Sequence, residues 1–216
     1  MSIQDRFSQQ DLQRIKDAVK DAESKISGEI VPVFVEKSSH YTIANYRAAL
    51  IGAALVFVLI IIFDRYIPRL AVYDPVLIFT LVSLGGLAGA IKANYLNFVK
   101  RMMVSQTYMD AATFKRAQTA FLEEEVFNTR QRTGIMIFVS FFEHEVIVMA
   151  DKGISKVVEQ KEWDGMVKVI IENVKQDRIT EGMVLAIKRC GELLLEKGFV
   201  VTPDDVNELR DDLRLE

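Results

Sequence analysis

Ala48-Ala49-Leu50-Ile51-Gly52-Ala53-Ala54-Leu55-Val56-Phe57-Val58-Leu59-Ile60-Ile61-Ile62-Phe63 is a run without a single charged residue. A second uncharged run extends from Pro75 to Ile91. With their flanking residues, both runs approach the roughly 20 residues that a helix needs to cross a bilayer. Tyrosines occupy the four ends, as the membrane interface favours: Tyr46, Tyr66, Tyr73 and Tyr95. The two runs predict a transmembrane hairpin closed by the loop 64–74, and a buried core hairpin is the alternative.

The charges around the hairpin indicate its orientation. A hairpin returns the chain to its starting side, where the flanks carry more cations than the loop does: Arg47, Lys92, Lys100 and Arg101 against Arg65 and Arg69. The positive-inside rule therefore places the flanking parts in the cytoplasm. The segment 1–6 has no apolar core behind a basic start, which argues against a cleavable signal. We expect a multi-pass protein of the inner membrane, with the lipid bilayer as its first partner and a cytoplasmic domain.

Composition narrows the classes of function. The 216 residues carry a formal net charge of −3, which argues against a nucleic-acid binder because such proteins need a basic face. The single cysteine, Cys190, excludes an internal disulfide and stands among apolar residues, as an inert packed thiol would. Two histidines disfavour a His-rich metal centre. We find no catalytic motif, and expect no metal or cofactor; whether the chain is an enzyme stays open, with the balance against it.

Outside the hairpin, the pattern predicts helices and short strands. Ser8 caps a helix whose apolar stripe runs to Ile26 and ends at Gly28. Residues 30–35 form a strand that is apolar on both faces, with Pro32 favouring an edge position. After the apolar hairpin we expect a long helix to about residue 127 and then a β-hairpin of strands 134–141 and 146–150. Two further helices follow, 163–174 and 180–198, and Thr180 caps the latter. A short helix is expected from Thr202.

The order of these elements defines an α/β protein with a small mixed sheet covered by helices. Its first part covers residues 1–43 and its second part residues 99–216. The transmembrane hairpin, residues 44–98, interrupts the domain between them.

Several short motifs then follow one another in a recognisable order. Thr129-Arg130-Gln131-Arg132-Thr133-Gly134 precedes a strand, and Ala150-Asp151-Lys152-Gly153-Ile154 closes the next one. Trp163, Glu181-Gly182 and Asn207-Glu208-Leu209 come afterwards. This succession resembles the TPM domain over essentially the whole chain, in the branch of bacterial membrane proteins that carry a transmembrane hairpin inside the domain. The resemblance implies a TPM-type sandwich; relatives have been proposed as phosphatases, cation binders and partners of membrane complexes, and LemA-type membrane proteins are a possible partner.

The chain departs from the family pattern at one point. Many relatives have Asp-Asn-Gly before the second strand, where this chain has Arg132-Thr133-Gly134. A permanent cation thus replaces a carboxylate suited to a hard metal ion, which speaks against calcium binding here.

The expected strand directions bring distant residues together. If the first strand runs toward the membrane, a helix of roughly 50 Å between residues 92 and 127 can carry the chain to the far end. The second strand then lies parallel to the first, and the third returns. A candidate binding patch at the membrane-distal end follows, made of Thr129, Arg130, Arg132, Thr133 and Asp151. The alternative is that Arg130 or Arg132 only forms an ordinary surface ion pair with Asp151.

At the other end of these strands we expect Glu143-His144-Glu145, as a solvated turn near the lipid headgroups. Within the hairpin, Gly52, Gly85 and Gly89 are the candidate helix-packing residues. They either pack the two helices of the hairpin against each other or form the interface of a homodimer.

The leading interpretation is a membrane-anchored, cytoplasm-facing binding or scaffolding module without evident catalysis. A TPM-type phosphatase and a cation-binding regulatory module are the alternatives.

Overall fold

The computed structural model describes residues 6–176, 178–202 and 207–215. The chain divides into two compact units, and each is described by itself. One combines Met1–Ser38 with Asp110–Glu216, and the other is Ser39–Met109. The inserted unit is longer at both ends than the segment 44–98, because short flanking stretches pack with the hairpin.

The first unit is built on a four-stranded sheet with the order β3-β2-β1-β4. The strands are β1 (Glu29–Val35), β2 (Gly134–Ser140), β3 (Glu145–Ala150) and β4 (Arg214–Leu215). β1 runs parallel to β2 and to β4, and β2 is antiparallel to β3. The predicted small mixed sheet is confirmed, and so is the parallel pairing of the first two strands.

The expected edge position of the first strand is wrong, because β1 lies between β2 and β4. Proline is nevertheless tolerated there. β4 has only two residues and pairs with Val33 and Phe34, so that Pro32 lies just before the paired segment. The missing N–H of Pro32 therefore costs no ladder hydrogen bond to β4.

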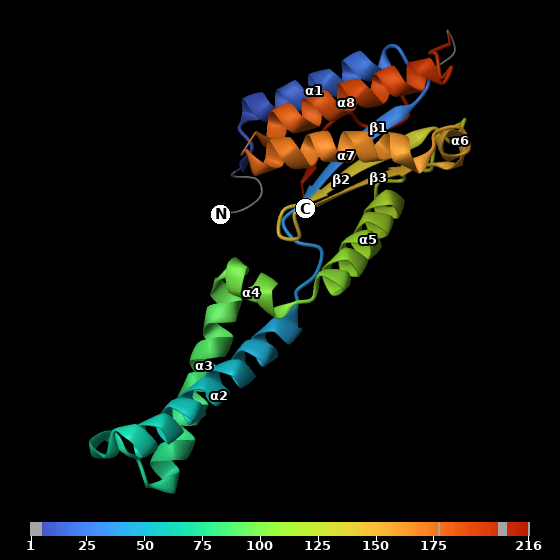
Figure 1. Ribbon diagram of the computed structural model, residues 1–216. Coiled ribbons are helices and arrows are strands. Elements are labelled where there is room, and N and C mark those ends of the chain that lie inside the picture. The colour runs from blue at the N-terminus through green and yellow to red at the C-terminus, as the bar shows by residue number, and fades with distance from the viewer. Residues whose placement is uncertain (1–5, 177, 203–206, 216) are drawn as a thin grey trace. The chain divides into compact units, whose positions relative to one another are not determined.

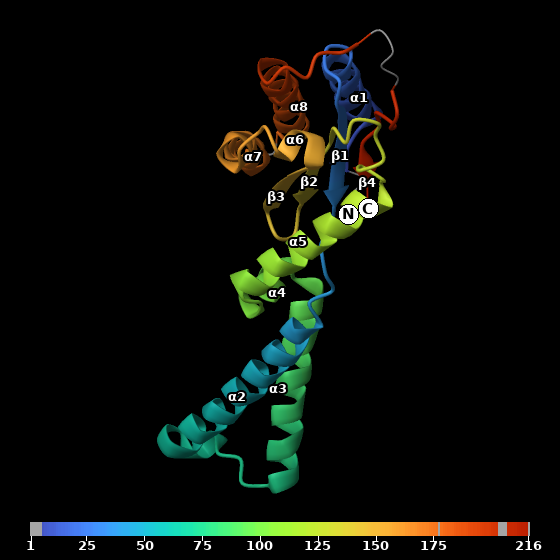
Figure 2. The same ribbon diagram turned by 90° about the vertical axis from the view of Figure 1, so that its right-hand side faces the viewer.

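Helices cover both faces of the sheet (Figure 2). On one face lie α1 (Gln9–Glu23), α7 (Gln160–Lys175) and α8 (Ile179–Glu196). The other face packs against α5 (Gln106–Glu123). Every residue of β1 and β2 is buried, because successive side chains enter opposite layers: Ile30 and Phe34 join the first, Val31 and Val33 the second.

Local signals at the start of α1 act as the sequence predicts. Ser8 accepts a hydrogen bond from the backbone N–H of Asp11 (3.1 Å), and the Asp11 carboxylate accepts one from the N–H of Ser8 (3.0 Å). This capping box satisfies two donors at the helix end. The helix ends at Glu23, earlier than expected, because Ser24 forms its C-cap and the chain turns toward β1.

Three further expectations about helices need correction or lie outside the described residues. Thr180 is not a cap: Arg178 takes that position, while Thr180 is buried and hydrogen-bonds to Asp11. The single long helix between residues 92 and 127 is instead interrupted, and α5 ends at Glu123 before Glu125 adopts a left-handed conformation (φ 51°). The short helix expected from Thr202 falls largely on residues 203–206, outside the described part of the chain.

The second unit contains two long apolar helices, α2 (Thr42–Tyr66) and α3 (Pro75–Tyr95) (Figure 1). Their most apolar windows have mean hydropathies of 2.5 and 1.9, and only 6% of each window is buried. By length and composition both helices could cross a membrane. Between them lies the short helix η2 (Pro68–Leu70), and Asp74 caps α3 by accepting a hydrogen bond from the N–H of Leu77 (2.8 Å). A seven-residue helix, α4 (Asn97–Met103), follows α3.

Candidate functional site

The five residues of the candidate patch gather at one end of the sheet. β1 and β2 are parallel with Glu29 opposite Gly134, and β3 ends with Ala150 opposite Ile135. The segment before β2 and the residue after β3 therefore meet, and the backbone N–H of Asp151 donates to the carbonyl of Gly134 (2.9 Å). The predicted approach of Arg132 and Asp151 is thus confirmed; whether the patch binds anything stays a prediction.

Arg132 and Asp151 form a two-pronged ion pair. Arg132 Nε lies 2.5 Å from Asp151 Oδ2, and Nη2 lies 3.0 Å from Oδ1. Asp151 is buried and also accepts a hydrogen bond from the N–H of Lys152 (2.7 Å), which caps the short helix α6 (Lys152–Ser155). Although burial opposes ionisation, the Arg132 guanidinium and the Lys152 N–H hold the pKa of Asp151 below its usual range. Asp151 is therefore ionised, and both of its carboxylate oxygens already accept hydrogen bonds.

Arg130 and the two threonines are fixed in a different way. Arg130 Nε pairs with Glu208 Oε1 (3.2 Å), and its backbone N–H donates to Glu208 Oε2 (3.0 Å). Thr129 accepts a hydrogen bond from the N–H of Thr133 (2.9 Å), and both threonines are buried. The threonines thus shape the loop, whereas the exposed groups of the patch are the guanidinium groups of Arg130 and Arg132, with side chains 68% and 48% exposed.

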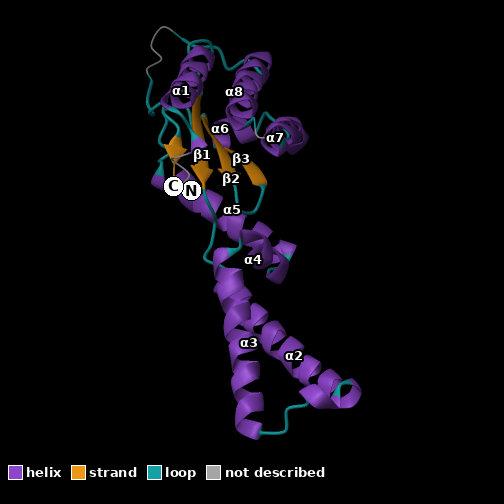
Figure 3. Ribbon diagram, turned by 90° about the vertical axis from the view of Figure 1, so that its left-hand side faces the viewer, coloured by secondary structure: helices purple, strands orange, loops and turns teal. Residues whose placement is uncertain are grey.

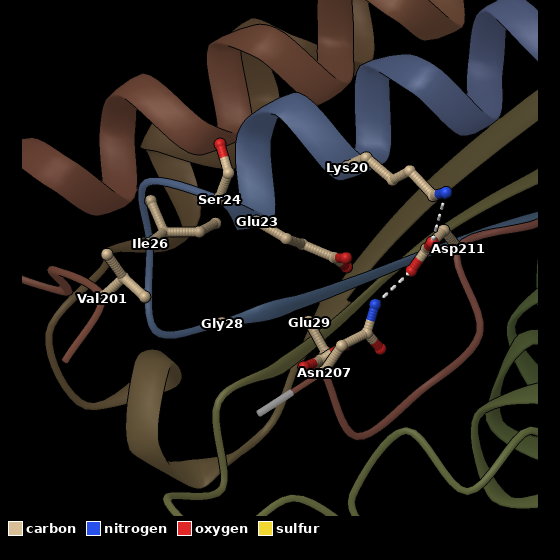
Figure 4. Close-up of a pocket in the computed structure, with 9 residues that line it drawn as sticks. All are labelled: Lys20, Glu23, Ser24, Ile26, Gly28, Glu29, Val201, Asn207 and Asp211. Atoms are coloured by element: carbon tan, nitrogen blue, oxygen red, sulfur yellow. Dashed lines mark hydrogen bonds and ion pairs between the residues drawn. The ribbon is translucent and has the colours of Figure 1, made fainter. Parts of the chain in front are cut away.

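A cavity of about 470 Å³ lies beside this loop, between the end of α1 and the segment 207–211 (Figure 4). It is lined by Lys20, Glu23, Ser24, Ile26, Gly28, Glu29, Val201, Asn207 and Asp211. A smaller hollow shares Gly28 and Glu29 with it and reaches Arg130 and Thr133. The candidate patch and the cavity therefore border one another.

Most polar groups around the cavity satisfy one another. Glu29 accepts hydrogen bonds from the backbone N–H groups of Glu208 (3.0 Å) and Leu209 (3.3 Å). Asp211 accepts one from the amide of Asn207 (2.5 Å) and lies 3.9 Å from the ammonium of Lys20. These contacts hold the C-terminal segment against the start of β1.

Glu23 is the exception. Its Oε1 accepts a hydrogen bond from the N–H of Ile30 (2.8 Å), but its Oε2 is buried, and no donor among the described residues reaches it. Burial raises the pKa of Glu23 to about 9, and the nearby charges of Glu29 and Asp211 contribute to this rise. Glu23 is therefore neutral at pH 7 and can donate a hydrogen bond.

This cavity was not predicted from the sequence. One signal was available: Glu23 follows Val19 by four residues and so borders the apolar stripe of the first helix. A second signal is Glu29, a charged residue directly before the apolar stretch 30–35, which the structure buries. The approach of Asn207 and Asp211 could not be predicted, because it depends on the path of the C-terminal segment.

The expectation of a solvated Glu143-His144-Glu145 turn is wrong for its first residue. Glu143 is buried, and its carboxylate accepts hydrogen bonds from the N–H of Ser38 (2.9 Å) and from the hydroxyl of Ser140. His144 is exposed in a left-handed conformation (φ 56°). The turn is thus anchored from inside, because Glu143 joins the chain just after β1 to the end of β2.

Among the described residues, no group of three or more His, Cys, Asp or Glu side chains is arranged to hold a metal ion. Cys190 is fully buried, and burial raises the pKa of its thiol to about 12. This environment keeps the thiol protonated, as expected of an inert packed cysteine.

The three candidate packing glycines face each other inside the hairpin. A Cβ on Gly52 would lie 2.4 Å from the carbonyl oxygen of Gly85, and one on Gly89 would lie 2.2 Å from that of Ala48. In Figure 3, α2 and α3 separate toward the loop that joins them. The glycines thus allow the helix backbones to approach within the hairpin, at its end away from this loop.

Comparison with known proteins gives one likeness, at the level of the fold. No family model and no curated protein matches the chain. The NMR structure of BA42 protein from the psychrophilic bacterium Bizionia argentinensis is similar, with a TM-score of 0.59 and 20% sequence identity over 97% of this chain and 95% of that chain. The class that fold and site define is therefore an α/β protein with an inserted apolar helical hairpin.

Proposed function

We propose that this chain is a TPM-type module, anchored in the inner membrane by α2 and α3, that binds a partner on the cytoplasmic side. Anchoring is supported by the two helices, which at 25 and 21 residues are about 37 and 31 Å long. A bilayer core is about 30 Å thick. Their exposed apolar side chains would be costly in water, whereas in lipid they need no further partner.

The observation that carries the binding role is the pair of exposed guanidinium groups at the patch. Arg130 and Arg132 are oriented by Glu208 and Asp151 before any partner arrives. Pre-ordered side chains lose less conformational entropy on binding, and guanidinium groups recognise carboxylates well. The patch therefore suits an acidic surface of a protein partner, of which a LemA-type membrane protein is one candidate.

A cation-regulated module is less well supported by the same geometry. A metal ion at Asp151 would have to displace the Arg132 guanidinium, which already occupies both carboxylate oxygens.

The patch is tested by cross-linking in native membranes. We expect the double substitution Arg130→Glu and Arg132→Gln to reduce the yield of the cross-linked partner at least about tenfold, since charge pairs at interfaces contribute several kcal/mol. The matched control is Lys188→Glu with Arg189→Gln, which makes the same charge change on the exposed face of α8. Emission of the buried Trp163 reports whether each variant is folded. An unchanged cross-linking pattern in a folded double variant would remove the patch from the proposal.

Orientation is tested by labelling with a membrane-impermeant thiol reagent in intact cells. We expect Ser2→Cys and Arg210→Cys to be protected, and Val72→Cys, in the loop between α2 and α3, to react. The native Cys190 does not interfere, because it is fully buried. Reaction at both termini with a silent loop would reverse the orientation, and reaction at only one terminus would rule out the hairpin.

A further inference from the structure

Helix α4 exposes large apolar side chains on one face. Phe98 and Met102 are 75% and 65% exposed and, four residues apart, lie on the same side of the helix. Tyr95, at the end of α3, is 78% exposed. No other part of the second unit covers these three side chains. They follow directly after the apolar run of α3.

The opposite side of α4 is held against the hairpin. α4 packs on both α2 and α3, and Lys100 on this side is buried. The Arg47 guanidinium of α2 donates a hydrogen bond to the carbonyl of Met103 at the end of α4 (2.8 Å). The helix therefore has a fixed orientation at the end of the hairpin, with Phe98 and Met102 directed away from α2 and α3.

Charge identifies the surface that fits this face. The segments 37–63 and 75–109 contain no aspartate or glutamate. Around the end of the hairpin at which α4 lies, they carry Arg47, Lys92 and Arg101, which are exposed or half-buried, while Lys100 is buried against the hairpin. A second copy of the same face would be repelled by these charges, whereas anionic lipid headgroups attract them. Aromatic and apolar side chains beside cations are the pattern of a helix that lies in the membrane interface.

We infer that α4 is an interfacial helix: Tyr95, Phe98 and Met102 enter the headgroup region of an anionic bilayer, and Lys92 and Arg101 contact lipid phosphates. The inference rests on the proposed anchoring by α2 and α3. It assigns to α4 the task of fixing the depth and tilt of the hairpin at one surface of the membrane.

Depth-dependent quenching of tryptophan tests the position of α4. The full chain is reconstituted into phosphatidylcholine vesicles with about one-third phosphatidylglycerol, in which bromine atoms are carried either near the headgroup or deep in the acyl chains. We expect the emission of Phe98→Trp to be quenched most by shallow bromines. Phe57→Trp, near the middle of α2, should be quenched most by deep bromines. The buried native Trp163 supplies a constant background, measured in the unsubstituted protein.

The two substitutions separate the two proposals. If Phe57→Trp is quenched but Phe98→Trp behaves like the unsubstituted protein, or responds most to deep bromines, the interfacial position is overturned and the anchoring stands. If neither is quenched, the anchoring fails as well.

Lipid selectivity tests the cations. We expect brominated phosphatidylglycerol to quench Phe98→Trp as if it bound at least about threefold more tightly than brominated phosphatidylcholine, since a cation at the surface favours anionic lipid several-fold. Adding Lys92→Gln and Arg101→Gln should abolish this preference. Adding Arg65→Gln and Arg69→Gln, at the other end of the hairpin, should preserve it. Equal preference in the two variants would contradict the assignment of Lys92 and Arg101.

Discussion

Glu23→Gln is expected to stabilise the first unit at neutral pH. Unfolded, Glu23 ionises near pH 4.5, but in the folded protein its pKa is raised to about 9 by burial. Between these values the folded state retains a proton that the unfolded state has lost, so stability falls as pH rises through this window. Glutamine has no proton to lose, and its amide can donate toward Asp211. At pH 7 the gain should reach roughly 3 kcal/mol.

The gain should depend on pH in a defined way. It should shrink as pH falls and disappear below about pH 4.5, where glutamate is neutral in both states. Urea unfolding followed by the emission of Trp163, the single tryptophan, measures it in the first unit. Glu192→Gln, an exposed residue paired with Arg189 on α8, is the control and should change stability by less than about 1 kcal/mol. A Glu23→Gln protein no more stable than the wild type at pH 7 would contradict the buried neutral carboxyl group.

Gly134→Ala is expected to destabilise the same unit strongly. Gly134 begins β2, and a Cβ there would lie 1.9 Å from the backbone carbonyl oxygen of Val126. Because the obstacle is backbone, no side-chain rotation relieves it, and the turn after α5 must move away from the sheet. Overpacking of this kind costs about 3 kcal/mol.

Gly165→Ala provides the matched comparison, because the same substitution meets no atom within 4 Å on α7. There it should stabilise the protein by about 0.5–1 kcal/mol, since alanine favours a helix over glycine. Opposite signs for the two variants, measured by urea unfolding, are the expected outcome. A Gly134→Ala protein as stable as the wild type would show that the Val126 turn does not constrain this position.

The parts of the fold that follow from local pattern were predictable. The capping box at Ser8 and Asp11 uses residues three apart. Strands β1 and β2 can be recognised in the sequence because they are apolar on both faces. The pairing of Arg132 with Asp151 followed from the strand directions alone. Each of these depends on neighbours in sequence or on one topological rule.

The missed features depend on segments that meet only in three dimensions. β4 has two residues and too little pattern to identify it. Glu143 reads as a turn residue, and its burial arises because Ser38 and Ser140 supply donors from two other segments. The Glu23 cavity likewise needs the end of α1 and the segment 207–211 to come together. Satisfied polar groups in the interior leave little trace in a hydrophobicity pattern.

The parallel pairing of β1 with β2 has a consequence for biogenesis. Glu29 pairs with Gly134, and the whole inserted unit is made between them. At about 5–20 residues per second, a ribosome needs roughly 5–20 seconds to synthesise the intervening chain. During that interval the nascent β1, apolar on both faces, has no strand to pair with. On the proposed anchoring, the unfinished domain exposes this aggregation-prone segment while α2 and α3 enter the membrane, and its sheet can form only after both helices have been synthesised.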